Sequence, residues 1–147
     1  MADFLLARSL GDAVIVHGGL GSSATRDRLA GYDARIAAAP EHLATGHGAV
    51  GRLLEQGPPP RALFCLSDLI AYGAHRRLRE AGVSVPGDCV IVGFDDNPFN
   101  DWVAPWLNSV RVPYADYGEA MVRAISGKRG AHTSGDAILP HRLVARN

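Results

Sequence analysis

The fold is decided by the stretch Cys89-Val90-Ile91-Val92-Gly93-Phe94-Asp95-Asp96. A short apolar run that is rich in β-branched side chains and ends in two acids is typical of a strand covered on both faces of a parallel sheet. A helical pattern from Asp68 to Gly82 precedes it, and the apolar run Ala62–Leu66 comes before that helix. This strand–helix–strand unit predicts two parallel strands joined by a right-handed crossover.

The same alternation continues in both directions along the chain. Further strands are expected at residues 13–16, 109–112 and 138–145, and further helices at 4–10, after Ser22 or Ser23, at 49–55 and at 114–125. Strands that alternate with helices in this way predict an α/β fold with a doubly wound parallel sheet.

One interval, between Tyr32 and His47, departs from the pattern. The alternation requires a strand here, but Ala37-Ala38-Ala39-Pro40-Glu41-His42-Leu43 is a poor strand sequence. We expect either that two helices meet directly or that a sheet strand is missing. A missing second strand would leave the edge of the 13–16 strand uncovered.

The charge balance argues against DNA binding by this sequence itself. The 147 residues carry 15 Lys and Arg against 15 Asp and Glu, which gives a net charge of zero. DNA binding draws much of its affinity from clustered Lys and Arg that displace counterions. The most basic stretch, Arg76-Arg77-Leu78-Arg79, falls on a helix and is expected to form a solvated face.

The cysteines and the hydropathy restrict the setting of the protein. Cys65 and Cys89 both lie inside apolar runs, where a free thiol acts as a small hydrophobic side chain, so we expect no disulfide framework and no zinc site. No apolar run approaches the roughly 20 residues that span a bilayer. The N-terminus lacks the pattern of a secretion signal. We therefore expect a cytoplasmic protein with no membrane partner.

Polar residues follow three of the predicted strands, where open parallel sheets bind their ligands. They are His17 to Gly21, Ser67-Asp68, and Asp95-Asp96-Asn97. A carboxylate accepts hydrogen bonds from two hydroxyl groups at once, which suits a sugar or nucleoside, and Arg26 adds donors on the same side.

Each of these residues also has a purely structural interpretation. Asp68 is well placed to cap its helix, with or without a ligand contact, and Arg26 can instead pair with an acid on the surface. For the two acids after the best strand, the sequence favours Asp95 as the ligand residue and Asp96 as its solvated neighbour.

The sequence contains few features that would indicate cofactor binding or catalysis. The loop Gly18-Gly19-Leu20-Gly21-Ser22-Ser23 lacks the spacing of a phosphate-binding or dinucleotide-binding loop, and a strand-to-helix turn explains its glycines. The six histidines have no metal-ligand spacing, and no Gly-x-Ser-x-Gly motif is present. We expect no cofactor, no metal and no enzymatic activity.

Several segments together resemble the LacI/GalR family of transcription regulators. The similar segments are 61–74, 78–88, 90–96, 104–113 and 118–121, preceded by Arg26-Asp27-Arg28-Leu29-Ala30-Gly31-Tyr32. They include Val-Pro-Gly-Asp at residues 85–88 and Gly-Phe-Asp-Asp at residues 93–96, and they occur in the family's order over most of the chain.

This resemblance implies an effector-binding domain of the periplasmic-binding-protein type, which has two lobes with a ligand between them. It places ligand contacts at Arg26, Asp95, Ser67-Asp68 and Ser22. It also implies a homodimer, whose surface we expect on helix Leu69–Ala81, and operator DNA bound only through an N-terminal helix-turn-helix that this sequence does not include.

The resemblance further implies a division of the chain into three parts. Residues 1–112 form the second lobe, residues 113–126 a return helix of the largely missing first lobe, and residues 127–147 a connector and the final strand of the second lobe. The expected function is the sensing of a sugar, polyol or nucleoside by a regulator. A solute-binding protein for transport, which shares the fold, is the alternative.

Overall fold

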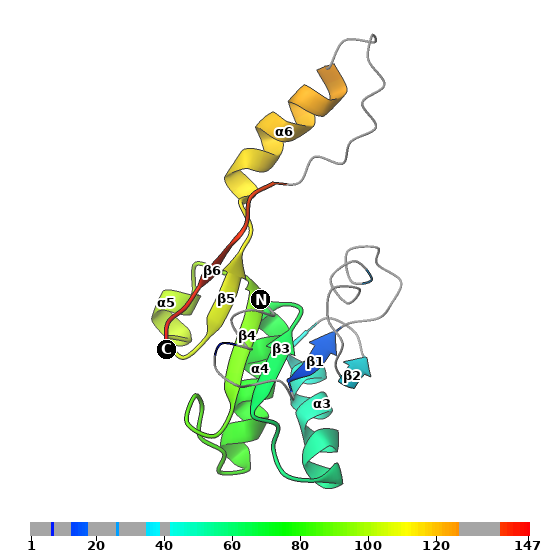
Figure 1. Cartoon of the computed structure of the whole chain (residues 1–147), viewed down its shortest axis with the longest axis vertical. Coiled ribbons are helices and arrows are strands. Elements are labelled where there is room, and N and C mark those ends of the chain that lie inside the picture. Colours follow the sequence, from blue (N-terminus) through cyan, green and yellow to red (C-terminus); the bar gives the residue numbers. More distant parts are fainter. Residues whose placement is uncertain (1–6, 8–12, 18–25, 27–34, 39–41, 127–138) are drawn as a thin grey trace.

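The computed structural model describes residues 7, 13–17, 26, 35–38, 42–126 and 139–147 (Figure 1). Its strands form one sheet in the order β2-β1-β3-β4-β5-β6. The strands are β1 (Val14–His17), β2 (Arg35–Ala38), β3 (Ala62–Cys65), β4 (Val90–Asp95), β5 (Asn108–Arg111) and β6 (Arg142–Val144). The helices are α3 (Leu43–Gln56), α4 (Asp68–Glu80), α5 (Asn100–Val103) and α6 (Tyr114–Ser126).

The first five strands in this order are parallel, and β6 returns antiparallel to β5. The predicted α/β fold with a mainly parallel sheet is therefore confirmed. In the centre of the sheet, Ile15, Leu63 and Ile91 are fully buried, as the continuous apolar runs predict.

The expectation for the interval between Tyr32 and His47 was wrong. A strand, β2, is present there and pairs in parallel with β1, from Val14 opposite Arg35 to His17 opposite Ala38. This strand lies at the edge of the sheet and has one neighbour, so the main-chain hydrogen bonds to β1 hold it without a strongly β-forming sequence. The edge of β1 is consequently covered.

Helices α3 and α4 cover one face of the sheet. Their apolar side chains, among them Val50, Ile70 and Leu78, form a core with Leu63 and Ile91. The two helices approach each other closely through glycine, because a Cβ atom on Gly73 would collide with the main-chain oxygen of Leu43. Helix α3 begins earlier than the sequence predicted, and this contact explains why the extra turn packs.

Helix α6 extends away from the sheet in Figure 1. It follows β5 directly and exposes Tyr117, Met121 and Val122. The helices expected at residues 4–10 and after Ser22 or Ser23 lie outside the described residues. In the part of the chain that the structure describes, no helix is long and apolar enough to cross a bilayer.

Candidate functional site

The site lies at the edge of the sheet where the parallel strands end. β1 ends at His17, β3 at Cys65 and β4 at Asp95, and the strand order reverses direction between β1 and β3. A single hydrogen bond from Leu66 N to Val16 O (2.9 Å) ties the ends of these two strands together. Parallel sheets bind ligands at such a switch point, so the fold supports the expected location.

Asp95 and Asp96 form a strained turn at this edge. Both have positive φ, 112° at Asp95 and 50° at Asp96, a region that residues with a side chain rarely occupy. Such conformations cost on the order of 1–3 kcal/mol each and persist only where surrounding contacts hold them. Strained backbone of this kind is common in ligand sites, and the half-buried Asp95 carboxylate is what this turn displays.

Asp96 does not have the solvated role that the sequence suggested. It is only 7% exposed, and its carboxylate binds the side chains of Arg111 and Arg146, with Arg146 Nη2 2.8 Å from Oδ1. Burial alone would raise the pKa of Asp96, but the hydrogen bonds from Arg146 and Arg111 outweigh it and lower that pKa. The prediction was wrong because Arg146, 50 residues away in sequence, returns on the final segment to pair with it.

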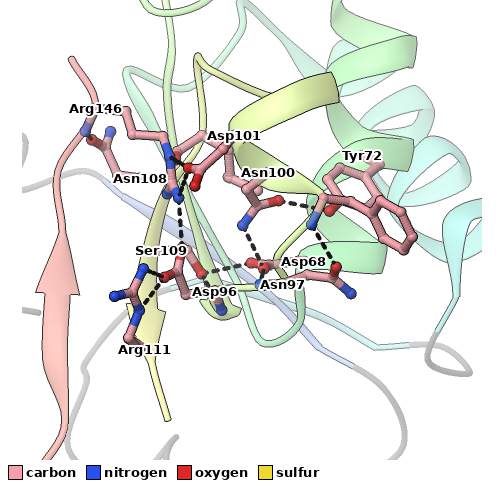
Figure 2. A network of polar contacts seen from close by, with 12 residues as sticks. Asp68, Tyr72, Asp96, Asn97, Asn100, Asp101, Asn108, Ser109, Arg111 and Arg146 are labelled. Carbon is pink, nitrogen blue, oxygen red and sulfur yellow. Dashed lines mark hydrogen bonds and ion pairs between the residues drawn. The ribbon is translucent and has the colours of Figure 1, made fainter. Parts of the chain in front are cut away.

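Asp68 is the most highly connected of the predicted site residues (Figure 2). Its Oδ1 accepts from Ser109 Oγ at 2.7 Å, and its Oδ2 accepts from Asn97 N at 2.7 Å and from Asn100 Nδ2 at 2.8 Å. The residue is 2% exposed. Burial raises the pKa of Asp68, while the three hydrogen bonds act in the opposite direction. Both oxygens are therefore engaged by the protein itself.

Gly93 makes room for this carboxylate. A Cβ atom at Gly93 would collide with Asp68 Oδ1, so a residue with a side chain cannot stand there while Asp68 keeps its place. This contact explains the Gly-Phe-Asp-Asp sequence. The absence of a side chain at Gly93 leaves space for the Asp68 carboxylate, and the two acids that follow form the turn.

Ser67, not Asp68, caps helix α4. Ser67 Oγ accepts from Ile70 N at 3.3 Å, which is the pattern of an N-cap side chain, while Asp68 is the first helical residue. The expectation that Asp68 caps the helix was wrong. Ser67 is half-buried at the carboxyl edge of the sheet, next to the end of β3.

The remaining predicted site residues are less closely defined. Arg26 is helical and exposed, and its placement beside Asp95 stays a prediction. Ser22 lies outside the described residues. The structure therefore brings Ser67, Asp68 and Asp95 to one edge of the sheet and leaves Arg26 and Ser22 as expectations.

Tyr114, the first residue of α6, also contacts this site. Its hydroxyl donates to Asp95 Oδ1 at 2.8 Å, so the first residue of α6 reaches the strained turn. The sequence predicts that Tyr114 lies on a helix but indicates no role for it. Its place directly after the end of β5, at the same edge as Asp95, is the feature that could have identified it.

Sequence reasoning also missed the buried partners Ser109, Asn100 and Arg146. Ser109 and Asn100 are fully buried polar residues, and each contacts Asp68. Arg146 additionally donates from Nη2 to Asp101 Oδ1 at 2.7 Å and from Nη1 to Leu107 O at 3.1 Å. A polar residue inside a predicted apolar strand, such as Ser109, was the available indication.

Exposed apolar side chains lie beside this network. We call Phe99, Trp102 and Val103 the α5 surface. The first turns of α3 and α4 also expose Leu43 and Leu69. Helix α4 contacts both other helices: Tyr72 donates to Asn100 Oδ1 of α5 at 2.6 Å, and Gly73 lies against Leu43 of α3. Trp102 is 85% exposed, an unusual position for the largest apolar side chain.

The chemistry available at the strand-end edge is hydrogen bonding rather than catalysis. Cys65 and Cys89 are buried free thiols, and burial raises the pKa of both, to about 12 for Cys89, so neither is an activated nucleophile. Among the residues that the structure describes, no group of three or more His, Cys, Asp or Glu side chains is arranged to hold a metal ion.

Comparison with known proteins agrees with the fold and with the motifs. The periplasmic binding protein-like domain matches residues 16–147. The ribose operon repressor of Haemophilus influenzae is 33% identical over 123 residues, which are 76% of this chain and 37% of that protein. The lactose operon repressor of Rhizobium radiobacter is 32% identical over 103 residues, which are 69% of this chain and 91% of that protein.

Solved structures extend the similarity to almost the whole chain. The crystal structure of the lac repressor dimer bound to operator and the anti-inducer ONPF superposes with a TM-score of 0.88 and 26% identity. The match covers 98% of this chain and 54% of that one. The present chain therefore corresponds to about half of that repressor and to about a third of the ribose operon repressor.

Proposed function

This chain belongs to the LacI/GalR family of periplasmic binding protein-like domains, and we propose that it is the effector-sensing part of a DNA-binding transcription regulator. The observation that carries the proposal is the strained Asp95–Asp96 turn, which displays one carboxylate at the ligand edge of the sheet while burying the other. The named relatives are repressors, which favours regulation over the transport alternative.

The proposed effector is a small molecule rich in hydroxyl groups: a sugar, a polyol or a nucleoside. Asp95 accepts hydrogen bonds from its hydroxyls, and Ser67 lines the neighbouring strand end. We expect Arg26 and Ser22, which follow β1 in the sequence, to supply further contacts. Asp68 contributes by holding the turn, since both of its oxygens already have donors. A similarity to a ribose operon repressor makes D-ribose the first compound to test.

We propose the following division of the chain. Residues 1–112 form the second lobe, α6 within residues 113–126 returns toward a first lobe, and residues 127–147 lead back into the second lobe. Two features support this division: α6 extends away from the sheet with Met121 and Val122 exposed, and β6 pairs with β5 of the lobe. Operator DNA is bound by a separate part of the regulator, in keeping with the net charge of zero here.

We also propose that two copies of this domain associate through the α5 surface. The sequence suggested helix Leu69–Ala81 as the dimer surface, but two side chains of that helix make contacts within the same chain. Tyr72 donates to Asn100, and the His75 ring stacks on Trp106 with 3.7 Å between the ring centroids. We therefore propose the first turn of this helix, with Leu69 exposed, together with Phe99, Trp102 and Val103 as the apolar surface for a partner.

Ligand binding is tested by thermal shift with D-ribose, D-glucose, ribitol and adenosine at millimolar concentrations. We expect at least one of them to raise Tm, because a ligand that binds only the folded state stabilises it. Asp95→Ala should abolish this rise, whereas Asp116→Ala, at an exposed carboxylate on α6, should leave it unchanged. The assignment of Asp95 as an effector-binding residue would be contradicted if none of the four compounds raised Tm, or if Asp95→Ala still showed the rise in Tm.

A further inference from the structure

The candidate ligand turn and the α5 surface are neighbours along the chain. β4 ends at Asp95 and α5 begins at Asn100, so only residues 96–99 separate them. The surfaces proposed for effector binding and for self-association are thus the two ends of one short connection. Contacts that hold residues 96–99 in one conformation therefore also determine the positions of the turn and of α5.

The carboxylate of Asp68 is linked to both ends of that connection, through Ser109 at the turn and directly at Asn97 and Asn100 (Figure 2). At the turn, Asp96 N donates to Ser109 Oγ at 3.0 Å, and Ser109 Oγ donates in turn to Asp68 Oδ1 at 2.7 Å. Toward α5, Asp68 Oδ2 accepts from Asn97 N and from the side chain of Asn100. One buried side chain therefore bridges the turn and the helix by hydrogen bonds on its two oxygens.

This arrangement makes the two ends mutually dependent. The positive φ values at Asp95 and Asp96 persist only while contacts hold them. Asp68 acts on this turn through Ser109 Oγ, which accepts from Asp96 N, and through the next main-chain amide, Asn97 N. Three donors converge on the buried side chain of Asp68, and the loss of one leaves a buried polar atom without its partner, which is costly. A displacement of the turn therefore moves Asp68 relative to Asn100, and through Asn100 it moves α5.

We propose that Asp68 is a positioning residue that couples the Asp95–Asp96 turn to helix α5, so that a change at the ligand turn alters the α5 surface. This inference rests on the proposed function only in identifying what the two surfaces bind. The coupling itself is a property of the hydrogen-bond network. Its consequence is regulation. An effector that binds Asp95 and displaces the turn changes the position of α5, and with it the position of Trp102 at the surface proposed to contact a second copy.

The coupling is tested without a ligand by hydrogen exchange at the amides of α5. Trp102 N and Val103 N donate to Phe99 O, and Ala104 N donates to Asn100 O, so these amides report on the order of the helix. Exchange is compared at low protein concentration in the native chain, Ser109→Ala, Asp68→Ala and the double variant. Asp88→Ala is the matched control, because Asp88 also accepts a main-chain N–H but lies on an exposed loop.

We expect Ser109→Ala, which cuts the link on the turn side, to accelerate exchange in α5 by roughly tenfold. In the Asp68→Ala background the same substitution should change it by less than about twofold, because the side chain that forms the bridge is absent. Asp88→Ala should leave α5 unchanged. If Asp68→Ala does not fold, Asn100→Ala provides the second background, since it removes the side chain through which Asp68 reaches α5.

Two results would overturn the proposal: exchange in α5 that is indifferent to Ser109→Ala, or an acceleration of equal size with and without Asp68. Neither depends on effector binding or on dimerisation. If the chain binds no sugar or stays monomeric, the proposed function is contradicted. The exchange experiment still tests the coupling, because it measures the hydrogen-bond network alone.

Discussion

At the scale of single residues, the site is organised by two buried carboxylates with different partners. Asp68 is surrounded by neutral donors, and burial raises its pKa, whereas Asp96 is paired with two guanidinium groups that lower its pKa. Arg146 is almost as buried as Asp96, with a side chain that is 11% exposed. A buried pair of this kind adds little net stability but is costly to break, because one charge is then left without a partner.

The Asp96 ion pairs predict a specific loss of stability in acid. Because its pKa in the folded state lies below the ordinary value of 3.8, Asp96 stabilises the fold above that pH, and this contribution is lost as the pH falls through the folded pKa. Asp96→Asn should lower the free energy of unfolding at pH 7 by roughly 3 kcal/mol and should make its decline below about pH 4 shallower.

Urea denaturation at a series of pH values measures this effect. The control is Asp116→Asn at an exposed carboxylate, which should reproduce the native pH profile. An Asp96→Asn variant whose profile has the native slope below pH 4 would show that Asp96 does not carry the acid sensitivity.

At the scale of the elements, the strands with continuous apolar runs were predictable, and the contacts between elements were not. β3, β4 and β5 were expected from their sequences, and each lies within one or two residues of the expected range. β2 was missed because an edge strand is held by main-chain pairing to β1, which composition does not reveal. Likewise, the sequence places Asp96 beside Asp95 but does not say that Arg146 returns on the final segment to bury it.

The glycine contact between α3 and α4 gives a prediction at this scale. Gly73→Ala places a Cβ atom against the main-chain oxygen of Leu43, so we expect it to lower the free energy of unfolding by about 2 kcal/mol. Gly48→Ala is the matched control on α3, because its Cβ atom would meet only the end of the Arg52 side chain, at 3.6 Å.

The two alanine substitutions should have effects of opposite sign. At Gly48 the gain in helix propensity should raise stability by about 0.5–1 kcal/mol. Guanidinium denaturation of both variants measures the difference. Equal effects at Gly73 and Gly48 would mean that the two helices do not approach as closely as the structure shows.

At the scale of the whole molecule, the fold and the ligand edge were predictable from the order of the elements, since carboxyl ends of parallel strands meet at one edge. The α5 surface was not. Phe99, Trp102 and Val103 occur in a polar and aromatic stretch without a period, and their exposure depends on how Asn100 and Arg146 anchor α5.

The α5 surface predicts self-association that a single charge abolishes. Trp102→Glu should raise the dissociation constant of the dimer by at least about 30-fold, because it removes a large apolar contact and places a charge in the interface. Val122→Glu introduces the same charge at an exposed apolar position on α6 and should leave the dimer intact.

Sedimentation velocity over a range of concentrations provides this measurement. The native chain should dimerise, and Trp102→Glu should sediment as a monomer at concentrations at which Val122→Glu remains dimeric. A native chain that stays monomeric throughout, or a dimer that Val122→Glu disrupts and Trp102→Glu does not, would place the interface elsewhere.

Amide chemical-shift mapping gives the sharpest test of whether the Asp95 turn at the carboxyl edge of the sheet binds the effector. The isotope-labelled chain is titrated with the compound that gives the largest thermal shift, or with D-ribose if the shifts are equal. We expect the largest changes in amide chemical shift at Asp95, Asp96, Ser67 and Tyr114. Changes confined to the groove between α3 and α4, which is lined by Leu43, His47, Gly73 and Arg76, would contradict this expectation.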